Sequence, residues 1–351
     1  MRSHADGVRV RRRATVKPMS FIRTQVAGGV GEIILDRPEA LNALDQTMID
    51  DMHDVLGRWG DDDSIETVLV TSASDRAFCA GGDIRAIREH AVAGEYDEIR
   101  NYFAAEYRLD QMIAHYPKAY VALIDGVAMG GGLGISVHGE VRVVTENSLM
   151  AMPETAIGFF PDVGATYFLP RLQRGVGMWL GLTGSRVRGA DAVHLGLATH
   201  FVPAAELDSV ADALRAGESL VDTLGGRSEL PASDIPVATI GEYFGDDNVA
   251  AILGGLRGAA GDDWAAEMVE LLEGASPTSL WVTAALLDAG RDSTLDECFD
   301  RELHAATTIT KTNDFSEGVR AMLVDKDRSP SFEPSTIDAV DQSVVASIVE
   351  D

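Results

Sequence analysis

Short apolar runs alternate with amphipathic stretches from Phe21 to about residue 205. The runs have the length and the β-branched content of buried strands, and they cover residues 30–35, 67–71, 119–124, 141–145 and 198–202. Asp45 precedes a stretch whose apolar residues recur at helical spacing, which predicts a helix with Asp45 as its N-cap. Strands that alternate with helices predict a mixed α/β fold with crossover connections.

The strand pattern fades near residue 204, and the following part of the chain has the pattern of helices. We expect helices over residues 251–256, 262–272 and 280–287. Asp314 and Glu317 have the spacing of a capping box, which predicts that a helix begins there and continues through Leu323.

Composition divides the chain into three parts. The polar, turn-rich stretch 225–236 is interpreted as a linker. The predicted parts are a basic disordered tail over 1–18, a core over 19–225 and a helical C-terminal region over 226–351.

The tail lacks the apolar middle of a secretory signal, so we expect a cytoplasmic location. The mitochondrial matrix is the alternative if this Arg-rich, acid-poor tail is a transit peptide.

Charge and composition exclude several classes of function. The net charge of −27 makes nucleic acid an unsuitable partner, because phosphate binding needs a basic surface. The longest apolar runs are short and broken by glycine, so no membrane span is predicted. The eight histidines show no metal-ligand spacing, which predicts no metal site. Cys79 and Cys298 lie far apart in sequence and favour a reducing compartment without a disulfide.

Glu154 and Asp162 are two carboxylates in a stretch, 148–172, that is otherwise almost free of charge. Each directly follows a proline, which favours extended or turn geometry, and the neighbours are mostly apolar. Burial raises the pKa of a carboxyl group toward the range that general acid/base catalysis needs. The alternative interpretation is a helix cap at Glu154 and a turn aspartate at Asp162.

Two glycine clusters follow predicted strands. The first is AGGDI, residues 80–84, and the second is MGGGLG, residues 129–134. Glycine leaves the main-chain N–H groups unshielded, so two such turns that meet could form an oxyanion hole for a carbonyl oxygen. The alternative is that these glycines serve only tight turns and close helix packing.

Four ordered motifs, LDRPEALNAL, RAFCAGGDI, KAYVALIDGVAMGGGLGISVHG and MPETAIGFFPDVG, resemble the crotonase (enoyl-CoA hydratase/isomerase) superfamily. The resemblance implies a spiral of ββα units that binds acyl-CoA thioesters, with CoA as part of the substrate and no separate cofactor. It implies oxyanion donors at the N–H groups of Gly82 and Gly131, with Ala80, Asp83 and Ile84 lining the adenine end of the CoA site. It also implies a homo-oligomer, a trimer or a dimer.

Within the superfamily, the chain is similar to the 3-hydroxyisobutyryl-CoA hydrolases in MPETAIGFFPDVG, YFLPRL, SPTSL and DFSEGVRAMLVDKDRSP. Hydratases carry a catalytic glutamate at the position of Gly134, so this chain retains only the second family glutamate, Glu154. The resemblance implies that Asp162 is the second catalytic carboxylate and that Glu106 contacts the substrate. For Glu106, which lies in a helical pattern, a solvated helix face is the alternative. Ala165-Thr166 departs from the hydrolase pattern, which has glycines there.

The expected function is hydrolysis of a short 3-hydroxyacyl-CoA, foremost 3-hydroxyisobutyryl-CoA from valine catabolism, by a backbone oxyanion hole and a Glu/Asp pair. The alternative within the same fold is an enoyl-CoA hydratase or isomerase, against which the glycine at position 134 argues. Two further alternatives are a non-catalytic module that binds RNA or protein and a structural assembly protein. The negative charge argues against RNA, and the Glu154/Asp162 pair argues against a purely structural role.

Overall fold

The computed structural model describes residues 20–225, 229–259 and 261–350, so the predicted tail over 1–18 lies outside the described residues. The larger sheet has the strand order β1-β2-β3-β5-β7-β10, and β1–β2 is its antiparallel pair. Its strands are β1 (Ile22–Ala27), β2 (Val30–Leu35), β3 (Thr67–Ser72), β5 (Ala119–Ile124), β7 (Val141–Val144) and β10 (His200–Phe201). The five predicted strands are confirmed, although β10 is shorter than predicted.

A second, smaller sheet has the order β4-β6-β8-β9, with the first three strands parallel. Its strands are β4 (Ala77–Cys79), β6 (Val127–Met129), β8 (Leu149–Ala151) and β9 (Val187–Arg188). A long strand of the larger sheet, a short strand of the smaller sheet and a helical segment follow one another three times along the chain. This repetition confirms the predicted spiral of ββα units. Because β4, β6 and β8 are parallel, the loops after them meet at one edge of the smaller sheet.

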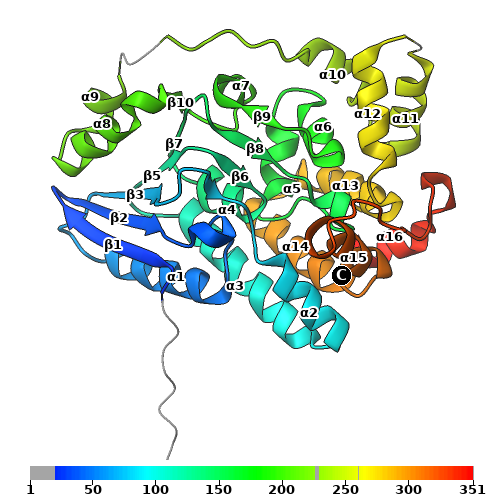
Figure 1. Ribbon diagram of the computed structural model, residues 1–351, viewed down its shortest axis with the longest axis horizontal. Helices are drawn as coiled ribbons and strands as arrows, with labels where there is room; N and C mark the ends of the chain where they lie inside the picture. The colour runs from blue at the N-terminus through cyan, green and yellow to red at the C-terminus, as the bar shows by residue number, and fades with distance from the viewer. Residues whose placement is uncertain (1–19, 226–228, 260, 351) are drawn as a thin grey trace, which may run out of the picture.

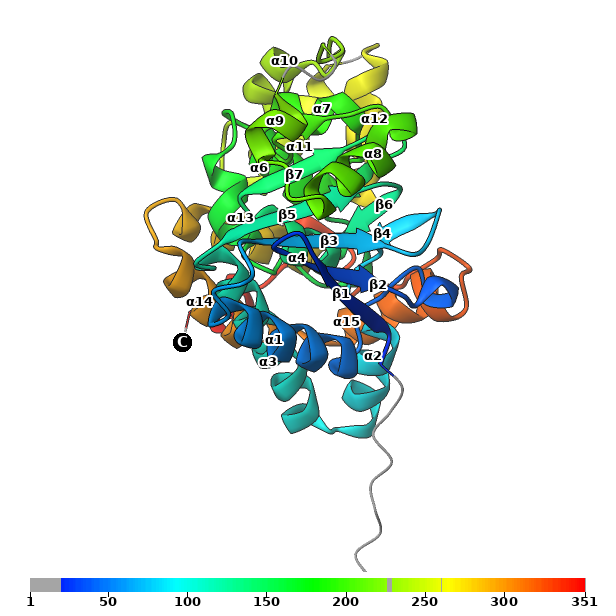
Figure 2. The same cartoon turned by 90° about the vertical axis from the view of Figure 1, so that its left-hand side faces the viewer.

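The helices of the first part of the chain cover this spiral. They are α1 (Gln46–Gly60), α2 (Ile84–Ala93), α3 (Tyr96–Ala114), α4 (Gly131–Val137), α5 (Ala165–Phe168), α6 (Val176–Thr183), α7 (Gly189–Leu195), α8 (Ala204–Arg215) and α9 (Leu220–Leu224). The Asp45 side chain accepts a hydrogen bond from the Met48 N–H at 2.9 Å, which confirms the predicted cap of α1. Figure 2 shows α1 and α3 side by side next to the larger sheet.

The second part of the chain is helical, as predicted. Its helices are α10 (Val237–Tyr243), α11 (Val249–Gly258), α12 (Asp263–Glu273), α13 (Pro277–Gly290), α14 (Leu295–Ile309), α15 (Asn313–Val319) and α16 (Gln342–Val349). Residues 229–236 form neither helix nor strand, in keeping with the linker interpretation. In Figure 1, α14 lies against α3 and α15 lies against α2, so the C-terminal helices pack directly on the core. A domain boundary at 225/226 stays a prediction.

The predicted capping box at Asp314 and Glu317 is wrong. Helix α15 begins one residue after Thr312, whose side chain accepts a hydrogen bond from the Phe315 N–H. Asp314 is buried instead, and its carboxylate accepts hydrogen bonds from the Ser276 hydroxyl at 2.6 Å and the Glu333 N–H at 2.8 Å. Ser276 and Glu333, which are distant in sequence, therefore bind the carboxylate that the local spacing assigned to a helix end. The helix continues as a π-helical turn, η4 (Arg320–Val324).

The packed interior includes both cysteines, which are buried and not bonded to each other. Among the described residues, no helix combines the length and apolar character that crossing a membrane requires. In the same residues, no group of three or more His, Cys, Asp or Glu side chains is placed to hold a metal ion.

Candidate active site

A cavity of about 240 Å³ lies where the loops after β4, β6 and β8 meet. Loops from three parallel strands, helix α3 and the π-helical turn η4 contribute to its wall. The described residues that line it are Ala80, Gly81, Gly82, Ile84, Phe103, Glu106, Met129, Gly130, Gly131, Pro153, Glu154, Ala156, Ile157, Phe159, Asp162, Met322 and Leu323. The structure thus brings together every predicted site residue except Asp83.

Gly82 and Gly131 lie next to each other across the cavity wall. A Cβ atom built on Gly131 would stand 3.3 Å from the Gly82 nitrogen. Within the described part of the chain, neither N–H group donates a hydrogen bond to another backbone group. Two adjacent, unused N–H donors at a cavity wall are the arrangement that the oxyanion-hole hypothesis needs. The packing interpretation also holds for Gly132, because a Cβ there would collide with the Cys79 carbonyl.

Glu106 is directed toward these two glycines from helix α3. Its Oε1 atom would lie 2.5 Å from a Cβ built on Gly131 and 3.6 Å from one built on Gly82. Glu106 is only 2% exposed, so the solvated-face interpretation is wrong. Among the described residues, this Oε1 has no hydrogen-bond partner. A buried, unpaired acceptor beside the glycines is available to a polar group of a ligand.

Glu154 lies on the other side of the glycine turn. It is the first residue of the short 3₁₀ helix η2 (Glu154–Ile157), and its Oε1 would lie 2.8 Å from a Cβ built on Gly130. Gly130 has φ +46°, so glycine is needed there for both the backbone conformation and the close approach of the carboxylate. The Glu154 Oε2 atom is buried and has no partner among the described residues. The helix-cap interpretation fails, since Pro153 is the N-cap residue.

Asp162 is the third carboxylate of the cavity. Its Oδ2 atom accepts a hydrogen bond from the Tyr107 hydroxyl at 2.7 Å, and the residue is 6% exposed. Tyr107 follows Glu106 directly on α3, so one helix places a carboxylate in the cavity and a hydroxyl on another carboxylate. Tyr107 was not predicted as a site residue, since nothing in the local sequence marks one tyrosine of a helix.

Three carboxyl groups, those of Glu106, Glu154 and Asp162, set the electrostatics of the cavity. Among the described residues that line the cavity, none is basic. Burial raises the pKa of Asp162 to about 7, even though the Tyr107 hydrogen bond lowers it. Burial first, and then the charge of Asp162, raise the pKa values of Glu154 and Glu106 well above the ordinary value. At neutral pH the cluster therefore retains protons that it can give or take during a reaction.

Asp110 is a fourth buried carboxyl group, one helical turn beyond Glu106 on α3. It is 0% exposed, and neither of its oxygens has a hydrogen-bond partner among the described residues. A Cβ on Gly134 would stand 2.8 Å from Asp110 Oδ2 and 2.8 Å from Val163 Cβ. The space at position 134 is therefore already filled, and a longer side chain there would displace Asp110 or Val163. Asp110 was not predicted from the sequence, because its environment comes from segments distant along the chain.

Asp83 is not among the described residues that line the cavity. Its carboxylate pairs with the Arg37 guanidinium at 3.0 Å, so its side chain is engaged elsewhere. Its predicted place at the adenine end of CoA stays a prediction. Met322 and Leu323, by contrast, line the cavity from the C-terminal region although the sequence did not predict them as site residues.

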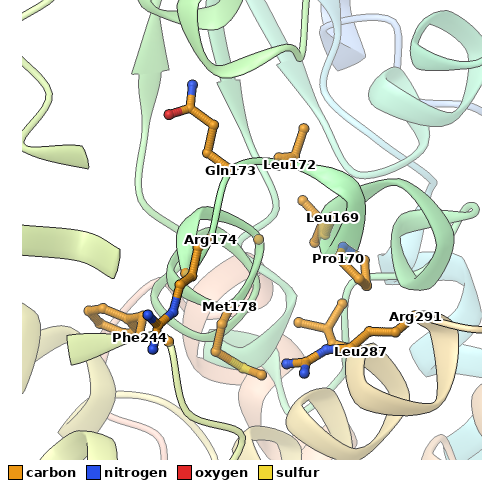
Figure 3. A pocket seen from close by; sticks show the side chains of 12 residues that line it. Leu169, Pro170, Leu172, Gln173, Arg174, Met178, Phe244, Leu287 and Arg291 are labelled. Carbon is orange, nitrogen blue, oxygen red and sulfur yellow. The ribbon is translucent and has the colours of Figure 1, made fainter. Parts of the chain in front are cut away.

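A second cavity, of about 370 Å³, lies between η3 (Leu169–Arg171), α6 and α13 (Figure 3). Arg174 and Arg291 lie at its wall, and Arg291 is paired with Asp247. None of the predicted site residues is among the described residues that line this cavity. The predicted site residues other than Asp83 therefore line the cavity of about 240 Å³ and not this one.

Comparison with known proteins extends over nearly the whole chain. The family model described as enoyl-CoA hydratase/isomerase matches residues 30–349. A curated relative from Danio rerio, named 3-hydroxyisobutyryl-CoA hydrolase, mitochondrial, is 41% identical over 342 residues. The match covers 94% of this chain and 89% of the relative.

Solved structures with the same fold carry other names. A carnitinyl-CoA dehydratase from Mycobacterium thermoresistibile has a TM-score of 0.88 and 39% identity, over 94% of this chain and 96% of that chain. An enoyl-CoA hydratase from Rhodobacter sphaeroides has a TM-score of 0.88 and 36% identity, over 94% of this chain and 97% of that chain. The reaction therefore has to be argued from the site.

Compared with wild type, the Asp162→Asn variant should become more resistant to unfolding as pH rises. The pKa of the Asp162 carboxyl is the ordinary 3.8 in the unfolded chain and about 7 in the folded protein. Its contribution to stability is therefore full below pH 4 and is lost as pH rises through about 7. Asparagine cannot ionise and keeps an oxygen for the Tyr107 hydroxyl. Relative to wild type, the free energy of unfolding of the variant should increase by about 2–3 kcal/mol between pH 5 and pH 8.

Urea denaturation at both pH values measures this difference. Asp97→Asn is the matched control, because the Asp97 side chain is exposed in the folded protein. A difference between Asp162→Asn and wild type that is the same at pH 5 and pH 8 would contradict the raised pKa.

Proposed function

We infer that this chain, which belongs to the enoyl-CoA hydratase/isomerase family, hydrolyses the thioester bond of 3-hydroxyisobutyryl-CoA to give 3-hydroxyisobutyrate and CoA. One observation carries the inference: Glu154 and Asp162 share a cavity with two unused glycine N–H groups, whereas position 134 has no carboxylate and no room for one. The Danio rerio relative of that name supports the choice of substrate.

The thioester carbonyl oxygen would accept hydrogen bonds from the N–H groups of Gly82 and Gly131. When a nucleophile adds to the carbonyl carbon, this oxygen becomes negative and the two hydrogen bonds strengthen. Loss of one such donor typically costs about 3–4 kcal/mol of barrier, so this contribution to the rate is large. Because no described basic side chain lines the cavity, the N–H groups are the groups available for this charge.

Glu154 would act on the carbonyl carbon in one of two ways. It either takes a proton from a water molecule, whose oxygen then bonds to the carbon, or it bonds to the carbon itself. In the second route the resulting anhydride is hydrolysed by water in a later step. In both routes the carbon–sulfur bond breaks, and the CoA thiolate leaves and takes up a proton. The Glu154 Oε2 atom, which has no hydrogen-bond partner among the described residues, is available for either role.

Asp162 would orient the attacking water or supply the proton to the leaving thiolate. Its pKa of about 7 is suitable for a group that exchanges a proton at neutral pH. The Tyr107 hydroxyl holds one of its oxygens, which leaves the other oxygen to the cavity.

Glu106 would accept a hydrogen bond from the 3-hydroxyl group of the substrate. Its Oε1 atom has no hydrogen-bond partner among the described residues and lies beside Gly131, one of the two proposed donors to the acyl carbonyl. A buried acceptor of this kind selects for a hydroxyl, because an acyl group without one leaves the oxygen unpaired.

Hydration or dehydration of an acyl-CoA is the second candidate, because the Rhodobacter sphaeroides and Mycobacterium thermoresistibile structures are named for such reactions. Position 134 argues against it. By the hydratase pattern a second catalytic glutamate belongs there, but Asp110 and Val163 occupy the space beside Gly134.

The proposed reaction needs no cofactor beyond the CoA of the substrate. The proposed binding partner of the chain is an acyl-CoA. Valine degradation is the setting that the Danio rerio relative's name suggests. That name also includes the word mitochondrial, which favours the matrix alternative over the cytoplasm. A homo-oligomer stays a prediction.

Glu154→Gln should lower the rate of CoA release from 3-hydroxyisobutyryl-CoA by at least about 10²-fold. Glutamine keeps the size of the side chain but neither accepts a proton from water nor forms an anhydride. A thiol-reactive dye measures the rate, and binding of free CoA measured by calorimetry is the control for an intact site. If the variant keeps most of its turnover, Glu154 is not the catalytic group.

Glu106→Met should reduce the preference for hydroxylated substrates. Methionine has a similar length but no oxygen, so the ratio of kcat/KM for 3-hydroxyisobutyryl-CoA over isobutyryl-CoA should fall about tenfold or more. Glu106→Gln is the matched control, since its amide oxygen still accepts a hydrogen bond and should preserve part of the ratio. An unchanged ratio in Glu106→Met would remove Glu106 from substrate selection.

A further inference from the structure

The segment that follows Asp162 has an unfavourable backbone conformation. Val163 has φ +54°, in the left-handed region, where a β-branched residue is a rare outlier. Such a conformation is energetically unfavourable and persists only where surrounding contacts enforce it. Gly164 follows with φ +81°, and a Cβ there would meet the His138 ring at 2.5 Å.

The peptide group between Val163 and Gly164 is held from both sides. The Val163 carbonyl accepts a hydrogen bond from His138 Nε2 at 2.8 Å. The N–H of the same peptide, on Gly164, donates to Glu302 Oε2 at 2.7 Å. Burial lowers the pKa of His138 to about 4, so the ring is neutral at pH 7 and its one N–H serves this carbonyl. Rotation of the peptide would break both hydrogen bonds.

Both carboxyl oxygens of Glu302 accept hydrogen bonds from residues 164–166. Its second oxygen, Oε1, accepts hydrogen bonds from the Thr166 N–H at 3.0 Å and the Thr166 hydroxyl at 2.6 Å. Glu302 is 0% exposed and comes from α14, in the C-terminal helical region, far along the chain from the loop. A carboxyl group is expensive to bury, and this one has three donors, from Gly164 and from Thr166 at the start of α5, and no basic partner among the described residues.

We propose that Glu302 is a positioning residue that, with His138, fixes the 163–164 peptide and thereby keeps the Asp162 carboxylate in the catalytic cavity. This inference rests on the proposed function, because it gives the 163–164 peptide the role of positioning the Asp162 carboxylate for that reaction. Asp162 is the residue before Val163, and within the described chain its carboxylate is held by the Tyr107 hydroxyl. If Val163 relaxes to negative φ, the backbone of Asp162 turns and its carboxylate moves away from Tyr107.

Glu302→Gln tests the proposal by a split between kcat and KM. A glutamine has one acceptor oxygen and an NH₂ group, so it cannot accept hydrogen bonds from both Gly164 and Thr166. We expect kcat for 3-hydroxyisobutyryl-CoA to fall about 10- to 100-fold, the effect of a small misplacement of a reacting group, with KM changed less than about threefold. An unchanged kcat in the folded variant would overturn the proposal.

Thr166→Val is a milder second variant that decides the question if Glu302→Gln does not fold. It removes the 2.6 Å hydrogen bond from the Thr166 hydroxyl to Glu302 and leaves the N–H donors of Gly164 and Thr166 in place. We expect a fall in kcat of about 3- to 10-fold, in the same direction. Thr310→Val is the matched control, because Thr310 is equally buried and its hydroxyl donates a hydrogen bond to the Ala306 carbonyl of α14. Equal kcat in both threonine variants would overturn the proposal.

Crystal structures of wild type and the same variants give a readout that needs no substrate. In Glu302→Gln, or in Thr166→Val, we expect the 163–164 peptide to rotate and the Tyr107–Asp162 hydrogen bond to lengthen or break. If wild type fails to hydrolyse the thioester, the proposed function fails, whereas these structures still decide what Glu302 does. An unmoved peptide in the variants would overturn the positioning role.

Discussion

Burial of several carboxyl groups in a cavity that no described basic side chain lines is the constraint on which this site depends. Glu106, Asp162 and Glu154 share one small cavity, and Asp110, one helical turn after Glu106 on α3, has no hydrogen-bond partner in the described chain. Four such groups cannot all ionise in a medium of low dielectric constant, so the cluster keeps protons at neutral pH. Burial of these four groups lowers the stability of the fold, but it places proton donors and acceptors next to the N–H groups of Gly82 and Gly131.

The fold supplies the positions that this arrangement needs. Parallel short strands bring the glycine turns at Gly82 and Gly131 to one edge, where side chains would block the approach of Glu106 and Glu154. Helix α3 adds Glu106 and Tyr107, and α14 adds Glu302 from the C-terminal region. Through Glu302, the helical region is hydrogen-bonded to the segment that follows Asp162 and is more than a cover for the core.

Sequence reasoning succeeded where the information is local. The long strands, the Asp45 cap and the two glycine turns could be predicted, because periodicity and short motifs encode them. The residues Tyr107, Asp110 and Glu302 could not, since their surroundings are made by distant segments. The short strands of the smaller sheet carry too few residues for a period to be recognised. The capping box failed at Asp314 for a related reason, because Ser276 and Glu333 claim its carboxylate.

The most direct measurement compares two reactions of the unaltered protein side by side. One assay follows release of the CoA thiol from 3-hydroxyisobutyryl-CoA, and the other follows loss of the conjugated double bond of crotonyl-CoA by hydration. A site with Glu154 beside the two N–H groups and no carboxylate at Gly134 should release CoA at least about 10²-fold faster than it hydrates crotonyl-CoA. Efficient hydration together with negligible release of CoA would contradict the account.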